Sequence, residues 1–342
     1  MKIKDVIECL KNEGTWVRWN RCTRDRILFG NAEQEVKKIV FVASGSSYNS
    51  ASVAKYFIEN QCELEVDVIY PNVFSQQKTH KMSDTILYVF ISQTGATKQV
   101  YDDVMDLQEK GYMVASIIGD LKSPIAKVSK NPIDMGCKHE EYKYRTIGVS
   151  TSIVTCWLLG CYLSDFQDMD TLLAVNSQLD GIVEQALVWY ENHKFDLMKR
   201  NVALFTGSYS LWPISVEADI KFMEMIPYLT KTYELEEFVH GPQNEFNNNE
   251  LFFVASKKGF EDNKTEAISK FLKNEIGCCY MVGDITLDEN DFKFECDEPY
   301  FYELKHLCFY QVIAYMLAND HGRDLKQGLN TQLTNYFNKT MQ

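Results

Sequence analysis

Two short segments rich in hydroxyl side chains each follow an apolar run, in a pattern that suits anion binding. Ser44-Gly45-Ser46-Ser47 comes after IVFVA (39–43), and SQTGAT (92–97) comes after TILYVFI (85–91). Apolar residues at helical spacing follow both segments, so each should open a helix. Helix N-termini attract anions, hydroxyls add donors, and Gly45 permits close approach. We expect a phosphate to be held by Ser44, Gly45, Ser46, Ser47, Ser92, Gln93, Thr94 and Thr97.

Helix capping is the competing interpretation, because Ser and Thr cap helices very often. Capping would account for either segment alone, whereas two hydroxyl-rich segments at equivalent places favour phosphate binding. Neither segment continues into the Gly-Lys-Ser/Thr of a P-loop, and neither is a GxGxxG fingerprint. The sequence therefore implies no nicotinamide cofactor, and we predict no cofactor of any kind.

The elements around these segments indicate an α/β fold. Strand, turn and helix alternate from residue 37 onward, with further apolar runs at LEVDVIY (64–70) and YMVASII (112–118). Continuous apolar strands between helices are typical of a parallel sheet covered on both faces. Ligands of such sheets bind beyond the carboxyl ends of the strands, so the two hydroxyl-rich segments should converge on one site. After about 160 residues the pattern restarts, which suggests a second, similar lobe.

The predicted organisation is two lobes, each with a parallel sheet between two layers of helices. We place the first lobe at 31–170 and the second at 201–320. A helical segment (1–30) precedes them, a helical connector (171–200) joins them, and a C-terminal tail (321–342) should lie near the active site.

Composition narrows the class of protein. The 342 residues carry a net charge of -13, spread along the chain, which argues against a nucleic-acid surface. No stretch reads as an export signal or a membrane span. The ten cysteines then indicate a reducing compartment, and none forms a CxxC pair or another metal-ligand pattern. We expect a cytoplasmic protein with no metal site, no nucleic-acid partner and no membrane contact.

Five segments together resemble the sugar isomerase (SIS) domain family, over nearly the whole chain. SGSSYNS (44–50) and SQTGAT (92–97) look like its paired signature, and GVST (148–151) is similar to its GVAST segment. The helix at 213–224 is similar to PIALEGALKLKE, and EFVHGP (237–242) to ELKHGP. The likeness is to the isomerase half of glucosamine-6-phosphate synthase and to fructosamine-6-phosphate deglycases. It implies two SIS-type lobes and a phosphorylated sugar or sugar-amine substrate.

The resemblance also implies roles for individual residues. Glu224 would move a proton between C1 and C2 of the sugar, and His240 of the neighbouring subunit would open the sugar ring. The implied assembly is a homodimer with shared active sites. Proton abstraction needs a base near both carbons, burial moves a Glu pKa toward working pH, and histidine titrates near neutrality. Ser150 and Thr151 would contact the sugar, and Glu217 would be structural.

Structural interpretations stay open for both titratable residues. Glu224 could be a solvated carboxylate on its helix. His240 could be a turn histidine that pairs with Glu236 or Glu237, one helical turn back.

Three departures from the family pattern bear on the activity. The chain length leaves no room for a glutaminase domain and no Cys follows Met1, so glutamine-dependent synthesis is not expected. Leu333 stands where the synthases carry a C-terminal lysine, and Lys326 is not at that place, which argues against lysine-assisted ring opening. The second lobe's turn (207–210) has fewer hydroxyls, so only the first lobe should bind phosphate.

We therefore expect a deglycase. It would convert a 6-phosphorylated ketosamine into an aldose imine, which water hydrolyses to an aldose 6-phosphate and a free amine or amino acid. Aldose-ketose isomerisation and amino-sugar phosphate deamination use the same proton transfer and remain alternatives. A non-catalytic sugar-phosphate-binding regulator is a third alternative, against which Glu224, His240 and the lack of a helix-turn-helix segment argue.

Overall fold

The computed structural model describes residues 36–77, 82–137 and 140–341. The contacts within the chain divide it into two compact units, one ending at residue 167 and including 327–342, the other comprising 168–326. The predicted helical segment 1–30 lies outside the described residues. The predicted connector corresponds to α8 (Asp170–Met198), a helix of the second unit.

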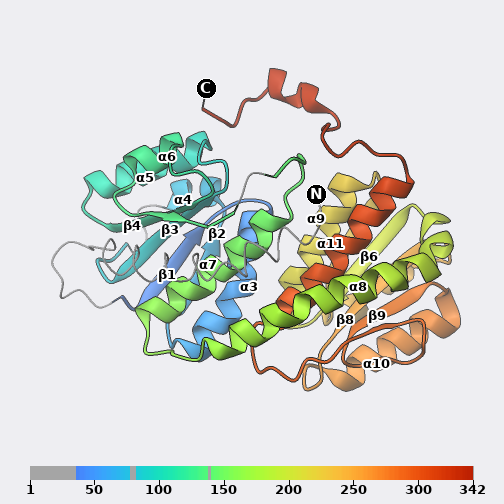
Figure 1. Cartoon of the computed structure of the whole chain (residues 1–342). Coiled ribbons are helices and arrows are strands. Elements are labelled where there is room, and N and C mark those ends of the chain that lie inside the picture. Colours follow the sequence, from blue (N-terminus) through green and yellow to red (C-terminus); the bar gives the residue numbers. More distant parts are fainter. Residues whose placement is uncertain (1–35, 78–81, 138–139, 342) are drawn as a thin grey trace. The chain divides into compact units, whose positions relative to one another are not determined.

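The first unit is a parallel sheet between two layers of helices (Figure 1). Its strand order is β2-β1-β3-β4-β5, and the strands are β1 (Lys38–Val42), β2 (Glu65–Ile69), β3 (Ile86–Ser92), β4 (Met113–Ile118) and β5 (Pro132–Asp134). On one face α3 (Ser46–Gln61) packs with α7 (Ile147–Leu163). The other face is covered by α4 (Pro71–Gln77), α5 (Lys98–Glu109) and α6 (Pro124–Val128).

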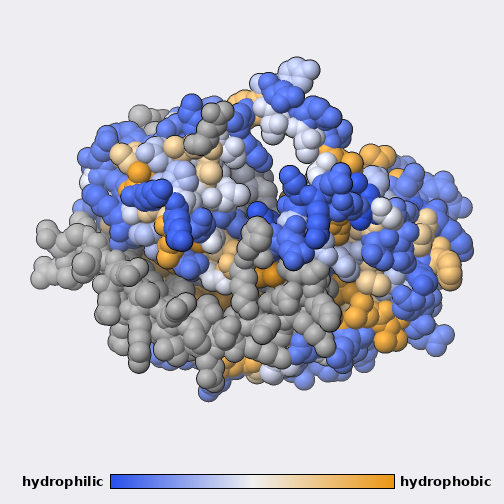
Figure 2. All heavy atoms as spheres, turned by 45° about the horizontal axis from the view of Figure 1, so that its top comes forward, coloured by the Kyte–Doolittle hydropathy of each residue, from blue (hydrophilic) through white to orange (hydrophobic). Residues whose placement is uncertain are grey.

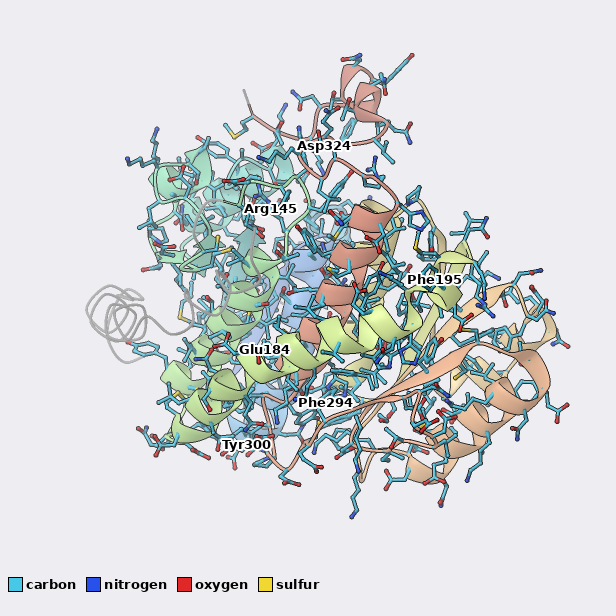
Figure 3. The ribbon with its side chains drawn as sticks, turned by 45° about the vertical axis from the view of Figure 1, so that its right-hand side comes forward. Arg145, Glu184, Phe195, Phe294, Tyr300 and Asp324 are labelled. Atoms are coloured by element: carbon cyan, nitrogen blue, oxygen red, sulfur yellow. The ribbon has the colours of Figure 1, made fainter. Side chains whose placement is uncertain are left out.

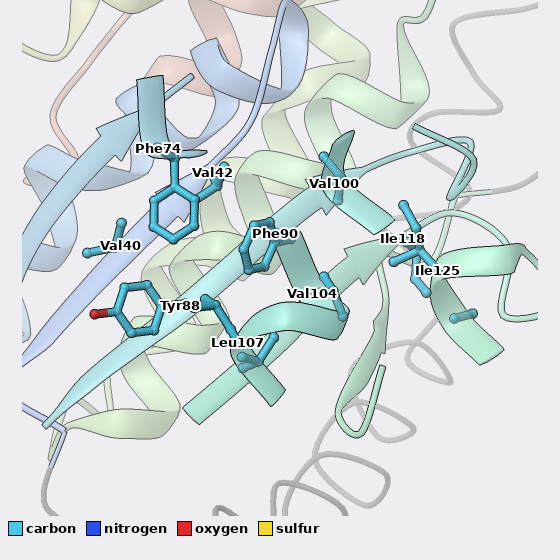
Figure 4. Close-up of a cluster of buried hydrophobic side chains, with 12 residues drawn as sticks. Val40, Val42, Phe74, Tyr88, Phe90, Val100, Val104, Leu107, Ile118 and Ile125 are labelled. Atoms are coloured by element: carbon cyan, nitrogen blue, oxygen red, sulfur yellow. The ribbon is translucent and has the colours of Figure 1, made fainter. Parts of the chain in front are cut away.

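The core of this unit explains why its strands are apolar throughout. Val40 and Val42 of β1 and Phe90 of β3 pack against Val104 and other residues of the helices on one face (Figure 4). Their neighbours in sequence, such as Phe41, are equally buried on the opposite face. Both faces of the central strands are therefore buried from solvent, as the continuous apolar runs predicted.

The second unit repeats this architecture. Its sheet has the order β10-β9-β8-β6-β7, and the strands are β6 (Val202–Gly207), β7 (Leu229–Glu234), β8 (Glu250–Ser256), β9 (Cys279–Gly283) and β10 (Phe292–Lys293). All of these pairs are parallel. Helix α11 (Glu303–Asp320) contacts α8 and α9 (Leu211–Met225) on one face, and α10 (Asp262–Phe271) lies on the other. The prediction of two three-layer α/β lobes is confirmed.

The surface shown in Figure 2 is mostly hydrophilic, with hydrophobic residues in small separate groups. Among the described helices, none combines the length and the apolar character needed to cross a membrane.

Candidate active site

The two hydroxyl-rich segments lie at the carboxyl ends of neighbouring strands. We call Ser44–Ser47 the first turn and Ser92–Thr97 the second turn. β1 and β3 pair in parallel with Val42 opposite Phe90, and β2 lies on the other side of β1. The two turns therefore flank the point where the strand order reverses, which is the usual ligand position in an open parallel sheet. They share one edge of the sheet, as a common phosphate site requires.

The first turn leaves the N-terminus of α3 open. Gly45 is the N-cap residue with φ of 58°, and no side chain of the described residues caps the helix there. Because the first N–H groups of a helix have no partner within it, they remain available to a ligand. Ser44 and Gly45 are exposed, and Ser46 and Ser47 are half-buried. The hydroxyls of this turn are thus not explained by helix capping.

The second turn is ordered by its own hydroxyls and by the C-terminal tail. The Ser92 and Thr97 hydroxyl oxygens are 3.0 Å apart. Within the first unit, the Lys98 N–H donates to the carbonyl of Lys339 at 3.0 Å and the Met341 N–H to that of Ala96 at 2.8 Å. Tail residues 339–341 therefore run along this turn. The predicted position of the tail near the active site stays a prediction.

Gln93 turns its side chain toward the start of α7. Its amide Nε2 donates to Glu140 Oε2 at 3.0 Å, while Thr94 of the same turn is exposed. Ser150 and Thr151 lie in the first turns of α7, each 5% exposed. The structure thus joins the second turn to the helix predicted to contact the sugar. Glu140 was not among the residues predicted from the sequence, since its partner Gln93 is 47 positions away.

Glu224 lies in the last turn of α9 beside a buried lysine. Lys221 Nζ is 2.9 Å from Glu224 Oε2 and 3.3 Å from Glu217 Oε1. The side chains of Lys221 and Glu217 are 1% exposed, whereas that of Glu224 is 35% exposed. Burial alone would lower the pKa of Lys221, but the two carboxylates outweigh it and raise the pKa above its ordinary value. The ammonium therefore stays charged and holds Glu224.

Lys221 lies in the helix that is similar to PIALEGALKLKE, but the sequence pattern alone gave it no role. The signal was present, because residues three and four positions apart on a helix face each other. Glu217, Lys221 and Glu224 have this spacing.

His240 follows a short 3₁₀ helix (Glu237–Val239) and is mostly exposed. Its Nε2 lies 3.1 Å from Glu236 Oε1, so the structural pairing considered from the sequence is present. The pKa of Glu236 is lowered, first by the hydrogen bond from Lys264 and then by that from His240. None of the contacts described for His240 joins it to Glu224 or Lys221, and its predicted role in a neighbouring site stays a prediction.

The equivalent end of the second sheet is filled by the protein's own side chains. The hydroxyl oxygens of Ser210 and Tyr302 are 2.7 Å apart, and Lys257 Nζ lies 4.5 Å from the centre of the Tyr302 ring. Glu303 is 4% exposed, and burial raises its pKa. The expectation that only the first unit binds phosphate stays a prediction.

Comparison with known proteins adds an independent observation. Residues 34–159 match the family model described as the SIS domain. The chain therefore contains a segment, within its first unit, that matches the SIS domain. The family resemblance drawn from the sequence motifs is confirmed.

Curated relatives match a larger part of the chain than the family model does. The chain is 25% identical over 350 residues to a glutamine–fructose-6-phosphate aminotransferase [isomerizing] of Aquifex aeolicus (strain VF5), and the match covers 97% of this chain and 57% of that enzyme. The chain spans about half the length of the curated relatives it matches.

Solved structures share the fold of this chain at low identity. A candidate phosphosugar isomerase of Clostridium difficile 630 has a TM-score of 0.87 at 19% identity, and the match covers 100% of this chain and 99% of that one. A glucosamine-6-phosphate deaminase of Thermotoga maritima has a TM-score of 0.74 at 21% identity, covering 96% and 97%. These likenesses establish the two-lobed fold.

Proposed function

We propose that this protein is a phosphosugar-processing enzyme that deglycates a 6-phosphorylated ketosamine. The observation that carries the proposal is the uncapped N-terminus of α3, which lies beside the second turn where the strand order reverses. Free amides, hydroxyls and the helix dipole together suit a dianion such as a sugar phosphate. The cluster of Lys221 and Glu224 in the second unit supplies a carboxylate for proton transfer.

The proposed reaction needs one base, which first accepts a proton and then returns a proton to the neighbouring carbon. Glu224 takes a proton from C1 of the open-chain ketosamine, O2 gains a proton, and an enaminol forms. Glu224 then returns its proton to C2 while the nitrogen loses one, which gives an aldose imine. Water adds to this imine and releases an aldose 6-phosphate and a free amine or amino acid. Lys221 keeps Glu224 oriented, and His240 of a second copy opens the sugar ring beforehand.

Amino-sugar phosphate deamination, or aldose-ketose isomerisation, is the second candidate. Both use the same movement of a proton between C1 and C2. The fold is shared with a glucosamine-6-phosphate deaminase and with a candidate phosphosugar isomerase, which supports both reactions as candidates. A non-catalytic phosphosugar-binding regulator is a candidate of another class, and it would bind these compounds without turnover.

A substrate panel in D₂O tests these candidates together. The protein is incubated with fructosamine 6-phosphates, with glucosamine 6-phosphate and with fructose 6-phosphate, and the products are followed by NMR. We expect release of the amine from fructosamine 6-phosphates, with deuterium at C2 in the fraction of turnovers in which the proton on Glu224 exchanges with solvent before its return. Release from glucosamine 6-phosphate alone would favour the deaminase, and tight binding without any product would favour the regulator.

The proposed base is tested by Glu224→Gln. We expect turnover to fall by roughly 10²–10⁴-fold, because the amide cannot accept the C1 proton. Phosphosugar affinity should stay within a few-fold, since Glu224 is not among the residues proposed to hold the phosphate. The matched control is Glu184→Gln, at an exposed position of α8, which should retain activity. Full turnover by Glu224→Gln would show that another group is the base.

A further inference from the structure

Glu140 places one buried carboxylate among five donors. It is 3% exposed. Its Oε1 accepts from the N–H groups of Thr146 at 2.7 Å and Ile147 at 2.8 Å, and from the Thr146 hydroxyl at 3.2 Å. Its Oε2 accepts from the N–H of Gly148 at 3.3 Å and from the amide of Gln93 at 3.0 Å. The carboxylate is therefore saturated with hydrogen bonds inside the protein.

Three of these donors are the first amides of α7. Such amides have no partner within their own helix, and a carboxylate there is also favoured by the helix dipole. Glu140 thus occupies the positive end of α7. The N-terminus of α3 begins at Gly45, which has no side chain, and none of the hydrogen bonds of the described residues caps it in a comparable way. Of these two helix N-termini, that of α3 is left for an external anion.

The fifth contact, with the Gln93 side-chain amide, fixes a residue of the second turn. A Cβ atom at Gly148 would lie 2.0 Å from Gln93 Nε2, so the amide crosses α7 where only a glycine leaves room. Arg145, in the loop that leads into α7 (Figure 3), has its guanidinium 3.8 Å from Glu140 Oε2, the one cation paired with Glu140 among the described residues. Since the five donors lie closer, the carboxylate serves mainly to join Gln93 to α7.

We propose that Glu140 is a positioning residue of the phosphosugar site. With one carboxylate it holds the second turn, through Gln93, against the helix that carries Ser150 and Thr151. By filling the N-terminus of α7 it also directs the phosphate toward α3. This inference rests on the proposed function, because it takes a sugar phosphate as the ligand.

Glu140→Gln tests the role with little change of shape. One side-chain oxygen remains for the α7 amides, but an NH₂ group replaces the oxygen that accepts from Gly148 and Gln93. Donor then faces donor at the Gly148 N–H, and the Gln93 amide must turn over before its oxygen can accept from the new NH₂ group, so its present position is lost. Gln93→Ala removes the partner, and the double variant completes a thermodynamic cycle.

The readout is the affinity for fructose 6-phosphate and for inorganic phosphate, measured by calorimetry. We expect Glu140→Gln and Gln93→Ala each to weaken binding of fructose 6-phosphate by about tenfold, the size of one hydrogen bond to a charged group. The double variant should be no weaker than either single variant. Glu109→Gln, at an exposed position of α5, is the matched control and should bind like the unmodified protein. Circular dichroism verifies that each variant is folded.

Several outcomes would overturn the inference. A folded Glu140→Gln variant with unchanged affinity would do so while leaving the proposed function intact, and so would fully additive losses in the double variant. If Glu140→Gln does not fold, Gly148→Ala displaces the Gln93 amide while keeping the carboxylate. Unchanged affinity in that variant would equally refute the role. If the unmodified protein binds neither ligand, the proposed function fails, and this inference fails with it.

Discussion

Lys221 lies between two carboxylates of unequal exposure. Its side chain and that of Glu217 are both 1% exposed, whereas Glu224 is 35% exposed. Glu217 can therefore neutralise the ammonium permanently, while Glu224 remains within reach of a ligand. A buried ion pair of this kind is costly to break, because the remaining charge is left in a poorly solvated place.

Replacing Lys221 with Met should destabilise the second unit. We expect the free energy of unfolding to fall by about 3–5 kcal/mol, since the buried Glu217 loses its cation. The double variant Glu217→Leu/Lys221→Met should recover most of that loss, because it removes both charges. Urea unfolding followed by circular dichroism measures both effects. A loss below about 1 kcal/mol for Lys221→Met would mean that Glu217 does not depend on this ion pair.

At the scale of elements, three helices of the first unit begin in three different ways. Among the described residues, no side chain caps α3, the first amide of α5 is bound by the carbonyl of Lys339, and α7 is capped by Glu140. These differences favour α3 as the proposed anion site. They also make the backbone geometry at Gly45 important, because this residue sets the direction of the first amides.

Gly45→Ala tests the geometry of the first turn. The φ of 58° at Gly45 lies in the left-handed region, where a Cβ atom costs roughly 1 kcal/mol. No atom lies within 4 Å of an added Cβ, so the effect is on the backbone alone. We expect a small loss of stability and weaker phosphate binding. Thermal denaturation measures the loss of stability, and calorimetry measures the phosphate affinity.

Gly111→Ala is the matched control for that variant. Gly111 also has a positive φ, of 84°, and open space around it, but it follows α5 at its other end. It should lose similar stability and keep its phosphate affinity. Equal losses of affinity in both variants would argue that the first turn has no special role.

A buried histidine on α11 should make the second unit sensitive to acid. His306 is 0% exposed, its Nε2 lies 3.0 Å from the carbonyl oxygen of Ser256, and burial lowers its pKa to about 4. In the unfolded chain a histidine titrates near 6.5. The unfolded state therefore binds the proton first, so this contribution to stability is fully present above about pH 6.5 and is lost as the pH falls toward 4.

We expect the free energy of unfolding to fall by about 3 kcal/mol through this histidine between neutral pH and pH 4. Urea unfolding at pH 7.5 and pH 4.5 measures it. The difference between the two pH values should shrink in His306→Gln, which keeps an amide donor but cannot titrate. His193→Gln on α8 should behave like the unmodified protein. An undiminished pH difference in His306→Gln would assign the acid sensitivity to other groups.

At the scale of the whole molecule, the family resemblance predicts a homodimer in which His240 serves the neighbouring site. Mixing two inactive variants tests this. If Glu224→Gln and His240→Asn chains exchange subunits, half of the dimers are mixed, and each contains one site with both native residues. Activity should return to about a quarter of the native value, as symmetry requires. No recovery, with light scattering showing mixed dimers, would place both residues in the same subunit.

The sequence by itself determined the strands that are buried on both faces and the two turns that follow them. Strands such as β1 and β4 consist almost entirely of apolar residues, so each can be recognised from its own short stretch of sequence. Strand β7, LTKTYE, escaped prediction because it lies at the edge of its sheet and is partly exposed along its length. Strand β5 has only three residues, which is too few for a pattern.

Only the tertiary structure decided which side chains meet. Local patterns report on neighbours along the chain, so the pairing of Lys221 with Glu224 was readable, at a spacing of three residues. The contact of Gln93 with Glu140 spans 47 positions, and the bond from Lys98 to Lys339 joins segments still farther apart. Such contacts depend on the order in which strands assemble, which places distant segments together and leaves no local signature.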